Sequence, residues 1–150
     1  MTNLEKPSNP ISSKLNKLVY SFIVVALVGL LDAVFLTVKH YTGDISCSLI
    51  TGCQEVLSSS YSVIFGIPTA LLGAGYYIVI LLAALIYAEQ KKGLMLKVLS
   101  YLPTLGFLFS LWLIYLMMFV IEALCQYCLL SAMTSTLLFI FSLILIKKNK

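Results

Sequence analysis

The four cysteines of this 150-residue chain fall into two close pairs. Five residues separate Cys47 from Cys53, and Cys125 and Cys128 form a C-x-x-C motif. Two cysteines at such a spacing can close a small disulfide ring. The thiolate of one pair can attack the disulfide of another through a mixed disulfide. The residue types and their spacing therefore favour thiol–disulfide redox chemistry passed between two pairs.

The composition places these cysteines in a membrane protein. Hydrophobic residues make up 61% of the chain and charged residues only 11%, whereas a soluble domain is roughly half apolar and about a quarter charged. The net charge of +4 comes from lysines that gather beside the apolar runs, and the chain has no arginine. Such lysines report membrane topology and do not indicate nucleic-acid binding.

Four apolar runs are each long enough to cross a hydrocarbon layer of about 30 Å as a helix. We therefore predict an all-α integral membrane fold, a four-transmembrane-helix bundle forming one domain over residues 18–146. Polar tails would flank it, and the segment between the first two helices would form an outward-facing loop or half-helix cap. The tails cover residues 1–17 and 147–150, and the spans cover about 18–38, 69–88, 98–121 and 125–146.

The lysines predict the orientation of the bundle. Nine of the ten lie in the N-terminal tail, the 89–97 loop and the C-terminal tail, and only Lys39 lies in the first long loop. Positive charge accumulates on the cytoplasmic side of membrane proteins. We therefore expect both termini in the cytoplasm and both cysteine pairs outside, where disulfides form and persist.

The two pairs differ in their expected setting. Cys125 and Cys128 begin a span, and the N-terminus of a helix stabilises a thiolate through its free N–H groups and its positive partial charge. Cys47 and Cys53 lie in a loop that can move to meet a soluble partner. Together they predict a relay from partner thiols to the loop pair, then to the helix pair, and finally to an acceptor in the membrane.

Two other interpretations of the cysteines remain open. Both pairs could form structural disulfides that tie the loops. Alternatively, the chain could be a soft-metal ion carrier, because paired thiolates bind thiophilic ions. A five-residue spacing and a single histidine, His40, are weak features for a closed metal site, so we assign no metal ligand.

Asp32 is an ionisable residue inside the first span. Such a group is energetically costly in a bilayer and is therefore a functional candidate. It could instead be a carboxylate near the interface that pairs with Lys39 or His40.

Further residues between and after the two pairs complete a longer pattern. It runs as Cys47-x5-Cys53, then Val56, Ser59, Tyr61, Phe65-Gly66-Ile67-Pro68 and Gly73, and finally Cys125-Gln126-Tyr127-Cys128. The combined pattern resembles the vitamin K epoxide reductase family, specifically its bacterial homologues. The resemblance covers about residues 18–146, nearly the whole chain.

The resemblance implies a four-helix bundle around a membrane quinone, ubiquinone or menaquinone. In it Cys125 and Cys128 are the pair that reacts with the quinone, with Cys128 in contact with the quinone and Cys125 exchanging with the loop. Cys47 and Cys53 would carry electrons from a thioredoxin-fold protein. Ser59 would lie near the site.

The resemblance also implies that the loop before Gly66 caps the quinone through Val56, Leu57 and Phe65. Many bacterial members carry a fused thioredoxin-like domain, which this sequence lacks, so we expect a separate partner of the DsbA type. Vertebrate members have a tyrosine where this chain has Ala132, so we expect ordinary quinone reduction.

The function implied is that of a membrane thiol oxidoreductase that supports disulfide bond formation. It would reoxidise an extracytoplasmic thioredoxin-fold disulfide oxidase and reduce the quinone. The location implied is the bacterial cell (inner) membrane, and we expect a monomer because the bundle encloses its own ligand.

Overall fold

The computed structural model describes residues 10–43, 52–90 and 92–149. Four long helices dominate these residues: α1 (Pro10–Thr42), α3 (Thr69–Gln90), α4 (Gly93–Phe119) and α5 (Gln126–Asn149). Between α1 and α3 lie four short elements: α2 (Cys53–Ser58), the 3-10 helix η1 (Ser60–Ser62), β1 (Val63–Ile64) and β2 (Ile67–Pro68).

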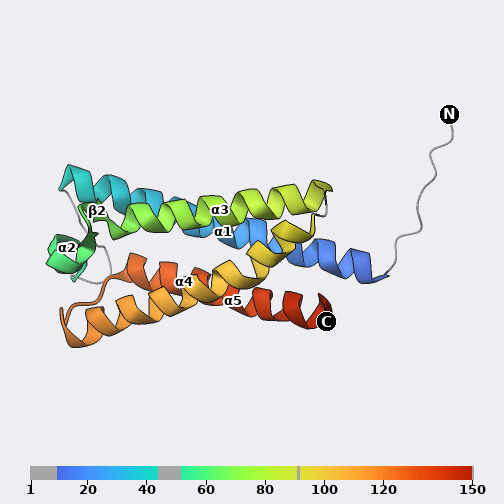
Figure 1. Cartoon of the computed structure of the whole chain (residues 1–150). Helices are drawn as coiled ribbons and strands as arrows, with labels where there is room; N and C mark the ends of the chain where they lie inside the picture. The colour runs from blue at the N-terminus through green and yellow to red at the C-terminus, as the bar shows by residue number, and fades with distance from the viewer. Residues whose placement is uncertain (1–9, 44–51, 91, 150) are drawn as a thin grey trace.

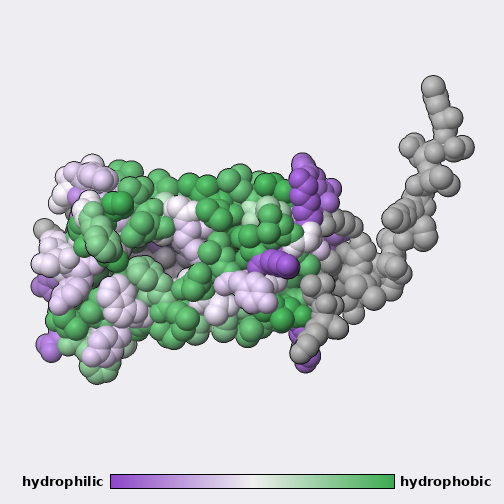
Figure 2. All heavy atoms as spheres, in the orientation of Figure 1, coloured by the Kyte–Doolittle hydropathy of each residue, from purple (hydrophilic) through white to green (hydrophobic). Residues whose placement is uncertain are grey.

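Each long helix contains a segment long and apolar enough to cross a membrane. These segments are Asn16–Thr42, Thr69–Gln90, Gly93–Phe119 and Gln126–Lys147. Apolar side chains cover the middle of the molecule, and hydrophilic side chains gather towards its two ends (Figure 2). The prediction of an all-α, four-helix membrane bundle is confirmed, and the chain is a multi-pass membrane protein.

Each long helix packs against at least two of the others. α1 lies against both α3 and α5, and α4 lies against α5. The ends of α3 and α4 adjoin near the C-terminus, but α4 then moves away from α3 towards the end that carries α2 (Figure 1). The cysteine-bearing elements therefore lie at the end where these two helices have separated.

The helices extend beyond the predicted spans, most of all at the N-termini of α1 and α4. α1 begins at Pro10 and not near residue 18, and α4 begins at Gly93 and not near residue 98. Proline suits the first turn of a helix because its missing N–H needs no partner there. Hydropathy marks only the part of a helix that lies in lipid, whereas backbone hydrogen bonds continue into polar residues.

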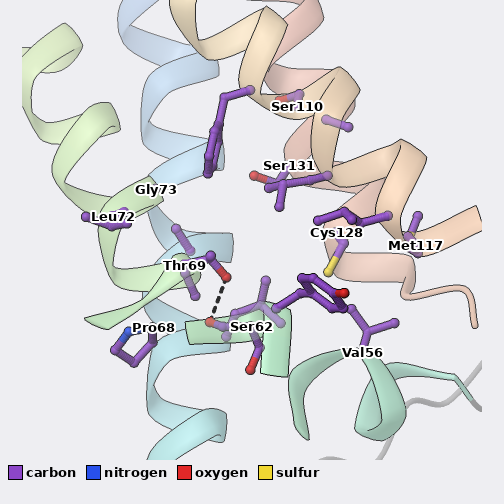
Figure 3. A pocket seen from close by; sticks show the side chains of 18 of the residues that line it. Val56, Ser62, Pro68, Thr69, Leu72, Gly73, Ser110, Met117, Cys128 and Ser131 are labelled. Atoms are coloured by element: carbon purple, nitrogen blue, oxygen red, sulfur yellow. Dashed lines mark hydrogen bonds between the residues drawn. The ribbon is translucent and has the colours of Figure 1, made fainter. Parts of the chain in front are cut away.

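A two-stranded hairpin precedes α3, and the sequence did not predict it. Ile64 pairs with Ile67, and the connecting residues Phe65 and Gly66 have φ angles of 53° and 82°. Positive φ at both central positions is the requirement of a type I′ turn. The Thr69 hydroxyl donates to the Ser62 carbonyl at 3.0 Å, which fastens the hairpin to the start of α3 (Figure 3).

Tyr77 joins three of the long helices. Its hydroxyl bonds the Thr134 hydroxyl at 2.7 Å and donates to the Ser131 carbonyl at 3.0 Å, both on α5. Its ring lies directly over Gly29 of α1, so that a Cβ at this glycine would overlap the ring. Small residues allow this kind of close helix approach in membranes.

We expect Gly29→Ala to destabilise the bundle by about 1–3 kcal/mol. The added methyl group meets a buried ring that two hydrogen bonds hold in place. Gly75→Ala on α3 is the matched control, because nothing lies within 4 Å of a Cβ there. Thermal unfolding in detergent measures both variants, and equal unfolding temperatures would contradict the proposed packing.

Candidate redox site

Cys125 caps the N-terminus of α5. Its carbonyl accepts the Leu129 N–H at 3.0 Å, and its Sγ accepts the Cys128 N–H at 3.3 Å. An N-cap side chain normally satisfies one of the free N–H groups of the first helical turn through an oxygen. Here a sulfur takes that position, as the placement of this pair at the start of a span led us to expect.

The same contacts make Cys125 the more acidic member of the pair. Its pKa is lowered, first by the hydrogen bond from the Cys128 thiol and then by the backbone N–H groups of Cys128 and Tyr127. Burial opposes this effect but does not reverse it. A thiolate at Cys125 is therefore stabilised by its own helix.

Cys53 and Cys125 belong to one buried apolar cluster, although 71 residues lie between them in the chain. Both are fully buried, and Cys128 packs against the same cluster. Cys53 is disulfide-bonded, whereas Cys125 and Cys128 are free thiols. Cys47 lies outside the described residues.

Gly52 explains how α2 approaches α5 so closely. A Cβ at this position would lie 2.6 Å from the carbonyl oxygen and 2.7 Å from the amide nitrogen of Leu124. Both neighbouring atoms are backbone, so no side-chain rotation could relieve the overlap. The absence of a side chain at residue 52 thus permits Cys53 to sit beside the turn that leads into Cys125.

An apolar cavity of about 380 Å³ opens beside the cluster, a size within the range of small-molecule sites. Cys128 lines it and Cys125 does not. In Figure 3 the side chains of Cys128 and Ser131 on α5 project towards a space bordered by α3, α4 and the hairpin. One C-x-x-C turn therefore presents one sulfur to the cavity and the other to the Cys53 cluster.

The residues expected to form the cap separate into two groups. Ser59, Val56 and Leu57 line the cavity, and the Ser59 hydroxyl donates to the Val56 carbonyl at 2.7 Å. Phe65 does not line it, and the expectation that this ring covers a bound ligand stays a prediction. Its exposed fraction is 101%, because residue 65 stands at the tip of the tight hairpin and its side chain points outwards.

Asp32 is 7% exposed, and its Oδ2 has no hydrogen-bond partner among the described residues. The alternative of a pair with Lys39 or His40 finds no support there, since the Lys39 Nζ lies over the Phe35 ring at 5.7 Å. Asp32 shares a shallow groove between α1 and α5 with Tyr127, inside the C-x-x-C motif.

His40, considered in the sequence only as a metal ligand or a partner of Asp32, lines the cavity. Tyr76 and Ser135 also line it and were not singled out in the sequence. A signal for one of them was present, because Cys128, Ser131 and Ser135 follow the i, i+3, i+7 spacing of one helix face. Within the described parts of the chain, no three His, Cys, Asp or Glu residues form a group that could hold a metal ion.

Comparison with known families agrees with this geometry. The model of the Vitamin K epoxide reductase family matches residues 20–143 of the chain, a range that holds all four cysteines and the whole cavity. No curated protein gives a significant match.

We expect Gly52→Ala to raise the rate at which a small alkylating reagent reacts with Cys125 by roughly tenfold. The added methyl group pushes α2 away from Leu124 and uncovers a buried sulfur. Mass spectrometry of the alkylated peptides measures the effect, with Gly75→Ala as the glycine control. Unchanged protection of Cys125 would show that close packing at residue 52 does not hold the cover in place.

We also expect the pH dependence of Cys125 alkylation to report its lowered pKa. The thiolate is the reactive form, so the reaction of the wild-type protein should reach half its maximum rate below the pH range of an ordinary cysteine. Cys128→Ala removes the thiol donor and should move the curve to higher pH, whereas Cys128→Ser keeps a donor and should move it less. Identical curves for all three proteins would rule out the hydrogen bond as the cause.

Proposed function

The chain belongs to the vitamin K epoxide reductase family and is a membrane thiol–disulfide oxidoreductase, and from this premise we propose that it generates protein disulfides at the expense of a quinone. The proposed electron donor is a separate extracytoplasmic thioredoxin-fold disulfide oxidase. The proposed acceptor is ubiquinone or menaquinone in the bacterial cell membrane.

One observation carries this proposal: the two sulfurs of the C-x-x-C motif face different surroundings. Cys128 lines the apolar cavity, and Cys125 lies in the buried cluster with Cys53. A structural disulfide needs no cavity at one sulfur and no second cysteine at the other. A relay between a loop pair and a membrane acceptor needs both.

The first internal step is a thiol–disulfide exchange between the loop and α5. We propose that the Cys53 thiolate attacks the Cys125 sulfur of an oxidised Cys125–Cys128 pair. A Cys53–Cys125 bond forms, and Cys128 leaves as a thiolate that faces the cavity. The burial of Cys53 and Cys125 in one cluster supports this choice of partners.

The second internal step returns the loop to its oxidised form. The Cys47 thiolate attacks Cys53, a Cys47–Cys53 disulfide forms, and Cys125 leaves as a thiolate. A thiol of lower pKa is the better leaving group, and the hydrogen bonds at the start of α5 lower the pKa of Cys125. The capping of α5 by this sulfur therefore favours release in the proposed direction.

Cys128 and then Cys125 each take up the proton that Cys53 or Cys47 gave up before its attack, and the final step consumes the two thiols of α5. A quinone accepts two electrons and two protons, so that Cys125 and Cys128 become a disulfide and the quinone becomes a hydroquinone. The cavity suits such a ring, because its lining is largely apolar, with hydroxyl-bearing residues such as Ser59, Ser110 and Ser131 among it. Ala132 also lines it. Vertebrate members have a tyrosine at this position, so ordinary quinone reduction is the proposed reaction.

Two features support the proposed orientation, with the cysteines outside the cytoplasm. The beginning of α1 and the end of α5 lie at the same end of the bundle, opposite α2 (Figure 1). Nine of the ten lysines belong to segments at that end or to the tails joined to it. The loop pair would therefore meet its partner in an oxidising compartment.

The direct test mixes the purified protein with a reduced thioredoxin-fold oxidase and a soluble quinone, and follows quinone absorbance with time. Turnover that disappears in Cys128→Ala establishes a quinone-linked disulfide generator. The absence of turnover from a protein with intact thiols would refute the proposal.

The relay further predicts that the two pairs respond differently to the reductant. Cys125→Ala and Cys128→Ala should abolish quinone reduction by both a small dithiol and the protein partner. Cys47→Ala and Cys53→Ala should keep the reaction with the small dithiol and lose the reaction with the protein. Equal loss in all four variants with the small dithiol would contradict the relay.

A further inference from the structure

Two hydroxyl groups in the cavity wall lack a well-formed hydrogen bond to any of the described residues. They are the Tyr76 hydroxyl on α3 and the Ser135 hydroxyl on α5, and both are buried. Both residues line the cavity. Buried hydroxyl groups in native proteins are nearly always satisfied, so two poorly satisfied hydroxyls in one cavity point to a ligand that supplies the missing partner.

The two hydroxyls lie close together. The two hydroxyls interact through a side-chain hydrogen bond, but its geometry is too poor to satisfy either group. A Cβ added to Gly106 of α4 would overlap the Tyr76 hydroxyl, so this group reaches across to α4. Residues of three helices therefore meet at this point of the cavity wall.

The two hydroxyls lie at a distance from the Cys128 sulfur that a quinone ring could span. Residue 135 follows residue 128 by seven positions on α5, which corresponds to about 10 Å of helix rise. Cys128 and the two hydroxyls thus lie at opposite ends of the cavity along α5. A planar quinone ring between them could contact the Cys128 sulfur with one edge. A carbonyl oxygen on its opposite edge could then meet the two hydroxyls.

Several other hydroxyl groups of the same wall have protein partners. Ser59 and Ser62 donate to backbone carbonyls of the cap, and Thr69 donates to Ser62. Tyr77, the neighbour of Tyr76, bonds both Ser131 and Thr134. Among the fully buried hydroxyls of the described lining residues, those of Tyr76 and Ser135 are therefore the ones without a well-formed hydrogen bond.

We propose that the Tyr76 and Ser135 hydroxyls bind the quinone carbonyl oxygen that lies farthest from Cys128. This inference rests on the proposed function and adds the residues that orient the acceptor. A carbonyl oxygen has two lone pairs and can accept from both hydroxyls at once.

These hydrogen bonds would assist the reaction as well as binding. During reduction, negative charge develops on the quinone oxygens, and donors already aimed at such an oxygen stabilise the charge. Tyr76 and Ser135 supply no net proton in this scheme, because the two protons of the hydroquinone come from the Cys125 and Cys128 thiols. Tyr76 and Ser135 would touch the substrate and would therefore be catalytic residues.

Binding is tested without turnover in a Cys128→Ala background, by equilibrium dialysis with a soluble naphthoquinone. Tyr76→Phe and Ser135→Ala should each weaken binding roughly three- to tenfold. Neither should lower the unfolding temperature of the ligand-free protein, since each removes a buried group without a well-formed hydrogen bond. The matched controls are Tyr87→Phe on α3 and Ser142→Ala on α5, both outside the cavity, and they should bind as the parent does.

Infrared spectroscopy of the bound quinone, labelled with carbon-13 at one carbonyl and then at the other, separates a direct contact from a structural effect. In the parent, one of the two carbonyl stretches should be lowered by hydrogen bonding, and Tyr76→Phe should reverse most of that shift. If neither the wild-type protein nor this parent binds quinone, the proposed function fails. If the parent binds and the variants keep both its affinity and its carbonyl frequencies, this inference is wrong while the proposed function stands.

Discussion

The single hydrogen-bonded turn at the start of α5 is the feature on which the rest of this molecule depends. Cys125 caps the helix through its own sulfur, and its Sγ accepts the Cys128 N–H. The cap determines that one sulfur stays in the buried cluster while the other faces the cavity. The same contacts lower the pKa of Cys125, so position and reactivity arise from one local structure.

The bundle has to bury Cys125 on one side of this turn and leave Cys128 open to the cavity on the other. Close packing provides the cover, because Gly52 lets α2 contact the backbone of Leu124. The opening results from the divergence of α3 and α4 towards the cysteine end (Figure 1). A helix that separates from its neighbour in a bilayer leaves space that only side chains, lipid or a ligand can fill, and here apolar side chains line that space.

The sequence predicted the four helices because they depend on a strong local signal. Long apolar runs define spans, whereas the role of the paired cysteines stays a prediction. The hairpin and the exposed position of Phe65 were not predicted, because strands of two residues carry no periodicity and the direction of a side chain at a positive φ depends on the whole turn. Gly52 was also not predicted, since a glycine in a loop reveals nothing about which distant backbone it touches.

Tyr76 and Tyr77 show the same limit of sequence-based prediction, here for single side-chain hydroxyls. The two residues are adjacent in the sequence and their rings pack edge to face at 5.1 Å. Nevertheless, the Tyr77 hydroxyl forms well-aligned hydrogen bonds to α5, whereas the Tyr76 hydroxyl forms none of good geometry among the described residues. Neighbouring residues on a helix point about 100° apart, so Tyr77 packs against α5 and Tyr76 is the residue proposed to bind the ligand. In the proposed relay this arrangement sets the order of events: the buried Cys125 receives electrons from the loop, and only Cys128 can pass them to a ring held at the far end of the cavity.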